Sequence, residues 1–246
     1  MSLYTIINTT YKSLFPKWLR HKIYLWMPCK ALRSRVIKAL ERTAKHDEIY
    51  DLRYYLEHQE PSMSQSADVI ANTIVSEFSP SSVVDVGCGT GMLLLALKRM
   101  GVRDCWGVEY SEAAIEICRQ RGLDVAKFDL QGSGKLDLKA DIVVSTEVAE
   151  HLPASSADSY VDILCGIADT VIFTASPPSQ GGTDHVNEQP NEYWIEKFVT
   201  SNLYRYQYEL SMKWREHWSK NDVALCYLNS LMIFQRECNR PEDNKR

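Results

Sequence analysis

The sequence predicts an α/β fold in which helices cover both faces of a largely parallel β-sheet. Short apolar runs rich in β-branched residues alternate with segments of high helix propensity, a pattern typical of parallel strands joined by right-handed helical crossovers. The chain has 246 residues, of which 45% are hydrophobic, so it can bury one substantial core. A glycine-rich turn after the first run is the third observation, because such turns bind ligands at the ends of parallel strands.

The first predicted strand and its turn span residues 83–91. The strand contains Asp85, and glycines follow at alternate positions, Gly87, Gly89 and Gly91, before a helix-forming run. Glycine has no Cβ, so the backbone can adopt left-handed dihedrals and approach a ligand closely. The spacing G-x-G-x-G lacks the third glycine of the dinucleotide fingerprint G-x-G-x-x-G. The segment therefore predicts a nucleotide-type cradle for a different ligand.

Residues 84–91, V-D-V-G-C-G-T-G, resemble motif I of the class I S-adenosylmethionine-dependent methyltransferases. The resemblance extends over roughly residues 66–236 and is most specific at 83–153. It implies a Rossmann-like seven-stranded sheet in the order 3-2-1-4-5-7-6, with the last strand antiparallel and with an N-terminal helical extension. It also implies an enzyme that uses S-adenosyl-L-methionine as cofactor and releases S-adenosyl-L-homocysteine.

Two further predicted strands end in acidic residues that resemble the family's cofactor contacts. The strand at 104–109 ends in Glu109, whose carboxylate can accept both ribose hydroxyls, and Asp129 closes the strand signal at 125–130. The resemblance implies that Asp129 accepts a hydrogen bond from the adenine amino group. The alternatives are a solvated loop glutamate and a capping aspartate. The residues predicted to bind the cofactor are Asp85, Gly87, Cys88, Gly89, Gly91, Glu109, Tyr110, Asp129, Leu130 and Glu147.

The second half of the chain predicts the remaining elements. The run at 141–146 is almost continuously apolar, as expected of a central strand buried on both faces. Between the last two predicted strands, residues 213–218 should form an aromatic and basic loop. Further strands are expected at 170–174, 204–211 and 224–234, and helices at 157–168 and 193–199.

We expect three parts in the chain: an N-terminal helical extension or lid at 1–62, a methyltransferase domain at 63–238 and a polar tail at 239–246. Residues 1–45 hold ten Lys or Arg residues and one acidic residue, a net charge of +9, so the rest carries −13 of the total −4. This acidic remainder disfavours nucleic acid as a partner. For the basic residues 12–45 we expect a helical layer or lid with solvated Lys and Arg side chains. The alternatives are contact with a membrane surface, RNA or an acidic partner.

The seven cysteines are scattered, without C-x-x-C pairs or metal-finger spacing. Such a set predicts reduced thiols and a cytoplasmic protein, and the basic segment leaves a peripheral position at the membrane surface as an alternative. No apolar run of the sequence approaches the ~18 residues that a membrane-spanning helix needs.

Acidic and histidine side chains follow the fourth predicted strand and recur in a later loop. Glu147, Glu150 and His151 come after the strand at 141–146, and His185 lies in the loop after the fifth strand. Both segments should reach the carboxyl-end rim of the sheet, where a methyl acceptor would bind. A hydroxyl acceptor must lose a proton, so we predict these four residues as catalytic candidates, with His185 as the first choice of base.

The pattern E-x-x-E-H with a later histidine resembles the metal site of the small-RNA 3′-terminal 2′-O-methyltransferases, where two glutamates and two histidines bind a divalent ion. By position, the ligands would be Glu147, Glu150, His151 and His185. The same E-x-x-E-H pattern also resembles ubiquinone-type O-methyltransferases. We expect no metal, and expect Glu150 and His151 to fix the adjoining loop by hydrogen bonds instead.

These features favour O-methylation of a small molecule, lipid, sugar or natural product, with that small-molecule acceptor as the main partner. The alternatives are a metal-assisted RNA 2′-O-methyltransferase and a non-catalytic subunit that binds the cofactor for a partner protein. The intact glycine motif, Glu109, Asp129 and the rim of acidic and histidine residues argue against the non-catalytic alternative.

Overall fold

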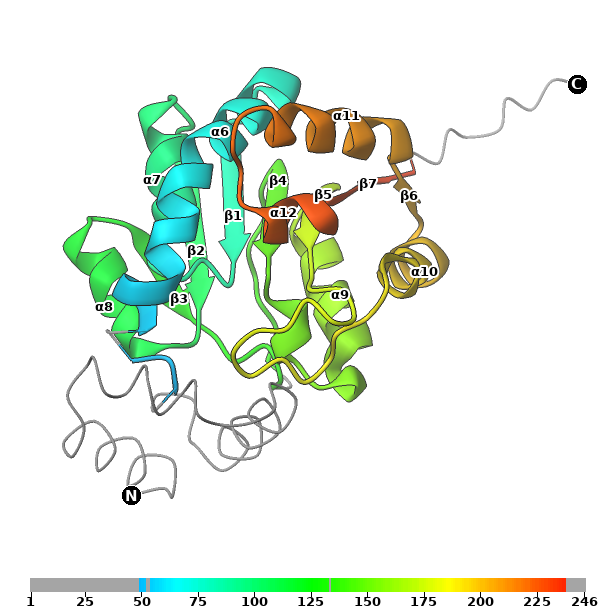
Figure 1. The fold of residues 1–246 in the computed structure, drawn as a ribbon, viewed down its shortest axis with the longest axis horizontal. Coiled ribbons are helices and arrows are strands. Elements are labelled where there is room, and N and C mark those ends of the chain that lie inside the picture. Colours follow the sequence, from blue (N-terminus) through cyan, green and yellow to red (C-terminus); the bar gives the residue numbers. More distant parts are fainter. Residues whose placement is uncertain (1–48, 52–53, 133, 238–246) are drawn as a thin grey trace, which may run out of the picture.

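The computed structural model describes residues 49–51, 54–132 and 134–237. These residues form a seven-stranded sheet in the order β3-β2-β1-β4-β5-β7-β6 (Figure 1), which confirms the predicted order. The strands are β1 (Ser82–Val86), β2 (Asp104–Glu109), β3 (Asp124–Lys127), β4 (Ile142–Thr146), β5 (Thr170–Thr174), β6 (Tyr204–Tyr206) and β7 (Met232–Arg236).

Neighbouring strands run parallel except at one end of the sheet. The pairs β1–β2, β1–β4, β2–β3 and β4–β5 are parallel, whereas β7 runs antiparallel to both β5 and β6. This confirms the prediction that the last strand is antiparallel. All five residues of β4 are buried, as predicted for a central strand with both faces covered.

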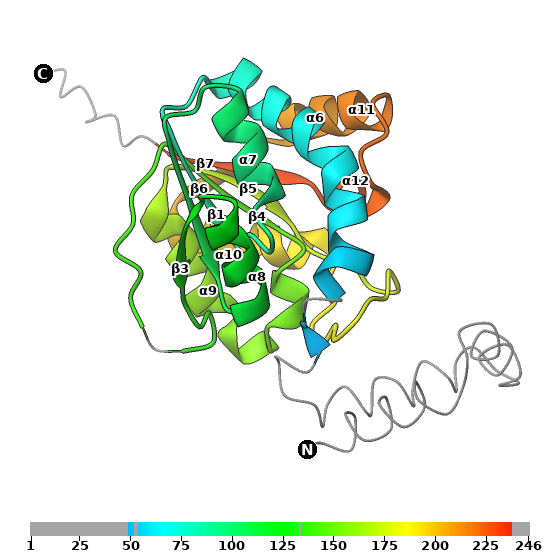
Figure 2. The same cartoon turned by 90° about the vertical axis from the view of Figure 1, so that its left-hand side faces the viewer.

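Helices cover both faces of the sheet, and Figure 2 shows α6, α11 and α12 together on one side. Val83 and Ile142 belong to the core under α6, α7 and α11, whereas Val84 and Val143 belong to the core under α9 and α10. Adjacent strand residues supply different cores because their side chains point to opposite faces. The α-helices are α6 (Glu60–Phe78), α7 (Met92–Arg99), α8 (Glu112–Gln120), α9 (Ala157–Ile167), α10 (Asn191–Asn202), α11 (Tyr208–Ser219) and α12 (Leu225–Asn229).

The prediction of an aromatic and basic loop at 213–218 is wrong, because these residues lie in α11. Trp214 and Trp218 are four residues apart, so they lie on one helix face, and both are buried. The Trp218 indole N–H also donates a hydrogen bond to Thr73 Oγ1 of α6 at 3.1 Å. Burying two large aromatic side chains against α6 and the sheet favours a helix over a solvated loop.

Three predicted strands are shorter than expected. The strand predicted at 204–211 covers only Tyr204–Tyr206, because α11 follows at once. The first half of the strand predicted at 224–234 is helix α12, and β7 begins at Met232. The third strand, β3, ends at Lys127, so Asp129 lies in the loop that follows it.

Most of the expected extension at 1–62, including the basic residues 12–45, lies outside the described residues, as does the tail at 239–246. The described part contains a π-helical turn, Tyr55–Gln59, which leads directly into α6. The expected boundary between 62 and 63 therefore falls inside a helix. Within the described ranges, no helix is long and apolar enough to cross a membrane, and the five cysteines there are free thiols.

Candidate functional site

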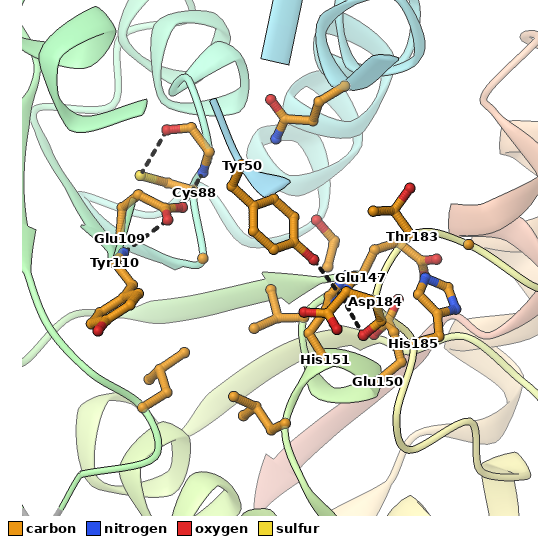
Figure 3. A pocket seen from close by; sticks show the side chains of 18 of the residues that line it. Tyr50, Cys88, Glu109, Tyr110, Glu147, Glu150, His151, Thr183, Asp184 and His185 are labelled. Atoms are coloured by element: carbon orange, nitrogen blue, oxygen red, sulfur yellow. Dashed lines mark hydrogen bonds between the residues drawn. The ribbon is translucent and has the colours of Figure 1, made fainter. Parts of the chain in front are cut away.

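A cavity of about 450 Å³ opens at the carboxyl edge of the sheet. Its walls come from the ends of β1, β2 and β4, the loop at 180–185, and the chain that leads into α6. Figure 3 shows the side chains that point into this space. All four predicted catalytic residues line it, and so do the predicted cofactor residues except Gly91. A Cβ on Gly91 would meet Leu123 and Cys118, so Gly91 allows close packing at the start of α7.

Gly87 and Gly89 line the cavity in left-handed backbone conformations, with φ of 76° and 52°. A Cβ on Gly87 would lie 2.3 Å from the Val148 side chain, and a Cβ on Gly89 would lie 1.9 Å from the Gln59 amide nitrogen. Both positions therefore require glycine, for the dihedral and for the missing side chain. The predicted cradle is thus formed by backbone that a ligand can approach closely.

Glu109 holds this cradle against the end of β2. Its Oε2 accepts a hydrogen bond from the Gly89 backbone N–H at 2.9 Å. Its Oε1 accepts from the backbone N–H groups of Tyr110 and Ser111 at 2.8 and 2.9 Å. The carboxylate oxygens retain further lone pairs, so the predicted contact with ribose hydroxyls is compatible with this structural role.

Asp85 is buried at the end of β1 and lines the same cavity. Burial, and after it the nearby charge of Glu109, raises the pKa of Asp85 to about 7. Near neutral pH the group is therefore partly protonated, so it can donate as well as accept hydrogen bonds.

Asp129 follows β3, and with Phe128 and Leu130 it lines the cofactor side of the cavity. Its Oδ1 accepts a hydrogen bond from the Gln131 backbone N–H at 2.9 Å, which stabilises the local turn. The position is compatible with both interpretations of Asp129, a contact to a ligand and a turn-forming aspartate. Leu130 is buried and provides an apolar wall beside it.

The start of α6 is tied to the glycine turn. The Arg121 side chain donates one hydrogen bond to the Thr90 backbone oxygen at 2.8 Å and one to Glu60 Oε1 at 2.6 Å. The Thr90 hydroxyl donates to Gln59 Oε1 at 3.5 Å. The residues just before and within the first turns of α6 thus form one side of the cavity. We call this side the N-terminal wall: Tyr50, Tyr54, Tyr55, Gln59 and Met63.

Glu147 is held in a strained backbone conformation after β4, with φ of 56°. Its Oε1 accepts from the Thr174 hydroxyl at 2.9 Å, and its Oε2 accepts from the Gln180 amide at 2.8 Å. Burial raises the pKa of Glu147. The carboxyl therefore joins the end of β5 to the loop that contains His185.

Glu150 is fully buried, and neither carboxylate oxygen has a hydrogen-bond partner among the described residues. Burial, and after it the charge of Glu147, raises its pKa well above the usual value. The loop is fixed by the Glu150 backbone oxygen, which accepts from the N–H groups of Val186 and Asn187 at 2.9 and 3.0 Å. Glu150 thus fixes the loop by hydrogen bonds, as expected, and it does so through its backbone oxygen.

His185 is oriented by Glu188, which sequence reasoning missed. His185 Nδ1 lies 3.1 Å from Glu188 Oε1, and this carboxylate also accepts from the backbone N–H groups of Gly181 and Ser179. A Cβ on Gly182 would lie 2.1 Å from His185 Nε2, so glycine provides the room for the ring. The only available signal was a carboxylate three residues after a histidine.

His151 lies beside His185, with ring centroids 4.9 Å apart and the rings nearly perpendicular. Its Nδ1 lies 3.0 Å from the Tyr50 hydroxyl and 3.4 Å from the Asp184 backbone oxygen. His151 thus contacts the loop of His185, as expected. The contact from the N-terminal wall, about a hundred residues away in the chain, carries no local sequence signal.

Three of the four predicted metal ligands come together. Glu150, His151 and His185 each offer one ligand atom, and these atoms lie within 4.8 Å of one another. Glu147 is not part of this group, and both of its oxygens accept the hydrogen bonds described above. A carboxylate with two imidazoles suits a divalent cation, so this group is where the described residues could hold one.

Parts of this chain are similar in sequence to known methyltransferases. Residues 55–162 match a family model described as "Methyltransferase domain". The ubiquinone biosynthesis O-methyltransferase of Methylococcus capsulatus is 39% identical over 28% of this chain and 32% of its own length. The ribosomal protein L11 methyltransferase of Thermoanaerobacter sp. is 32% identical over 32% of this chain and 28% of its own length. Residues 55–162 therefore form a methyltransferase domain, and the chain resembles the class I S-adenosylmethionine-dependent methyltransferases.

A solved structure supports the fold over a longer stretch. The magnesium protoporphyrin IX methyltransferase of Synechocystis, with bound S-adenosylhomocysteine, aligns with a TM-score of 0.52 and 19% identity. The alignment covers 72% of this chain and 84% of that chain. In contrast, this chain spans only about a third of the curated relatives' length.

S-adenosylmethionine is the cofactor of this family, and the residues present fit it. The left-handed glycines expose backbone that the cofactor's amino-acid end can approach. Glu109 lies at the tip of the neighbouring strand, where ribose hydroxyls bind in doubly wound folds. Phe128 and Leu130 provide an apolar surface suited to a base.

Proposed function

We propose that this protein transfers a methyl group from S-adenosylmethionine to a hydroxyl group of a small acceptor. The observation that carries the proposal is one continuous cavity, which runs from the glycine cradle to the pair of His151 and His185. The methyl donor and a proton-accepting side chain would therefore share one enclosed space. The name of the ubiquinone-type relative, an O-methyltransferase, supports oxygen as the acceptor atom.

The bound cofactor would supply an electrophilic methyl group on a positively charged sulfur. The protein's part is to hold the acceptor in line and to remove the hydroxyl proton. An ionised Glu188 carboxylate can accept a hydrogen bond but cannot donate one. Neutral His185 beside it therefore carries its hydrogen on Nδ1. Nε2 of His185 is then the nitrogen that accepts the proton, and Glu188 stabilises the resulting imidazolium.

The size and charge of the site favour a small acceptor. A volume of about 450 Å³ lies in the range of small-molecule sites. The acidic character of the chain outside residues 1–45 disfavours long contacts with a nucleic acid backbone. We propose a small molecule in the cytoplasm as the main partner, while the contact expected of residues 12–45 concerns a segment outside the described residues.

A cation-assisted reaction is the second candidate. It is favoured by one observation, the buried Glu150 carboxyl without a hydrogen-bond partner in the described structure, next to two histidines. A divalent ion there would bind the acceptor's hydroxyl oxygen and lower its pKa. We still expect the reaction to proceed without metal, because the His185–Glu188 pair already offers a base.

The experiment is a turnover assay of the full chain with S-adenosylmethionine and a panel of phenols, catechols, sugars and short RNAs. S-adenosylhomocysteine is measured with and without a chelator. We expect turnover with at least one small hydroxyl compound and retained activity in the chelator. Methylation of the RNAs alone, or of amines in place of hydroxyls, would contradict the proposal.

A further inference from the structure

Tyr50 connects the two ends of the cavity, although it lies outside the stretch that matches the family model. Its backbone oxygen accepts a hydrogen bond from the Ser111 hydroxyl at 3.1 Å, beside the carboxylate of Glu109. Its own hydroxyl lies 3.0 Å from His151 Nδ1 (Figure 3). The side chain is only 7% exposed. Tyr50 is therefore held through its backbone at Ser111 and through its hydroxyl at His151.

The hydrogen-bond chemistry at His151 Nδ1 depends on this hydroxyl. The Asp184 backbone oxygen, 3.4 Å away, can only accept, so it favours a hydrogen on Nδ1. The Tyr50 hydroxyl, at the shorter distance of 3.0 Å, can donate, which favours a bare Nδ1. The nitrogen that carries the hydrogen in a neutral imidazole is set by the bond that the other nitrogen makes.

At His185, the partner of Nδ1 favours a hydrogen on that nitrogen. Its Nδ1 faces Glu188 Oε1 at 3.1 Å, and an ionised carboxylate can only accept. The hydrogen of neutral His185 is therefore on Nδ1, and its Nε2 is an acceptor. Two neighbouring histidines, 4.9 Å apart, thus have different partners on the same ring position.

We propose that Tyr50 donates a hydrogen bond to His151 Nδ1 and so fixes neutral His151 in the Nε2–H tautomer. His151 is then the hydrogen-bond donor of the pair, and His185 is the proton acceptor. An acceptor hydroxyl needs both functions, because its oxygen can accept from one ring while its hydrogen is given to the other. Tyr50 is thus a positioning residue, and the roles assigned to the two rings rest on the proposed function.

The test is a nuclear magnetic resonance measurement of the histidine tautomers. The full chain is labelled with ¹⁵N-histidine and studied at a mildly alkaline pH, where imidazoles are neutral. Spectra are recorded without ligand and with S-adenosylhomocysteine, and His151→Gln assigns the signals of His151. In the unmodified protein we expect the Nε2–H pattern at His151 and the Nδ1–H pattern at His185.

Tyr50→Phe removes the hydroxyl and retains the ring. The Asp184 carbonyl then favours a hydrogen on Nδ1, so the His151 signals should change to the Nδ1–H pattern, while those of His185 stay the same. Tyr54→Phe is the matched control, since Tyr54 packs edge-on against Tyr50 and lines the same wall. It should leave both histidines unchanged.

An Nδ1–H pattern at His151 in the unmodified protein would overturn the inference, even if the variant failed to fold. The same tautomer in Tyr50→Phe as in the unmodified protein would overturn it too. The proposed function fails in a different way, through absence of S-adenosylhomocysteine binding in calorimetry or of turnover. Because the tautomers can be read in the ligand-free protein, the two failures are distinguishable.

Discussion

The two ends of the cavity differ in how their polar groups are satisfied. At the cofactor end, the Glu109 carboxylate accepts three backbone hydrogen bonds. At the acceptor end, the fully buried Glu150 carboxyl has no hydrogen-bond partner in the described structure. Buried polar groups are normally paired. The Glu109 carboxylate therefore stabilises the protein's own backbone, whereas the Glu150 carboxyl can bind a group that enters the cavity.

The largest expected effect concerns the acceptor end. His185→Gln should lower kcat by about 10²–10⁴-fold, the usual cost of losing a general base, while S-adenosylhomocysteine affinity changes little. Initial rates with the best acceptor of the panel and calorimetry measure the two quantities. His217→Gln, on the exposed side of α11, is the control. A full rate in His185→Gln would move the role of base to His151.

The next effect concerns the cofactor end. Gly89→Val should lower S-adenosylhomocysteine affinity by at least ~100-fold, because a side chain at φ 52° strains the turn and meets Gln59. Gly122→Val tests the strain alone, since Gly122 also has a positive φ but no atom near its Cβ position. The control should keep its affinity. Equal affinities in both variants would remove the glycine cradle from the cofactor site.

A smaller effect comes from Asp85 and depends on pH. Its pKa is raised from an ordinary value of 3.8 to about 7 in the folded protein, so the unfolded chain releases this proton first as pH rises. The group's contribution to stability is therefore full below pH 3.8 and is lost as pH rises toward 7. Between about pH 5 and 7 the loss is on the order of 2 kcal/mol.

Denaturant unfolding across that pH range measures the Asp85 contribution in the ligand-free protein. Asp85→Asn should flatten the fall in the free energy of unfolding. Asp137→Asn, in an exposed loop, should leave the fall unchanged. A slope that survives in Asp85→Asn would assign the pH dependence to other carboxyls.

The smallest effect is expected at Glu150. Glu150→Met replaces an unpartnered buried carboxyl by an apolar side chain, so the free energy of unfolding should rise by about 1 kcal/mol. Mg²⁺ or Mn²⁺ should not change the melting temperature of the unmodified protein. Glu209→Met, at an exposed position of α11, is the control. A metal-dependent rise in melting temperature that Glu150→Met abolishes would establish the cation-assisted candidate.

Features of both ends of the cavity could be predicted from the sequence. The glycine turn and Glu109 were predictable, because a strand, a left-handed turn and a helix need particular residue types at fixed local spacing. The sheet order was implied by the resemblance to class I methyltransferases. The rim residues Glu147, Glu150, His151 and His185 were predictable as a group, since the ends of parallel strands meet at one edge. Their gathering in one cavity is a property of the fold that short patterns capture.

The contacts that closure of the fold creates were not predictable. Tyr50 reaches His151 across about a hundred residues, and no local pattern encodes that distance. Glu188 lies in a loop whose shape depends on the Glu150 backbone. The charged and aromatic composition of residues 213–218 led to the prediction of a loop in place of helix α11. The four-residue spacing of Trp214 and Trp218 was the signal that indicates a helix.

The ion pair between Glu60 and Arg121 bears on how this protein can be shortened or recombined. Arg121 also holds the Thr90 backbone oxygen, so the first turn of α6 works as a clamp on the glycine turn. A protein cut at residue 63 would keep every motif of the family and still lose that clamp, together with Gln59 over Gly89. The smallest unit that can be exchanged between relatives therefore starts before the π-helical turn.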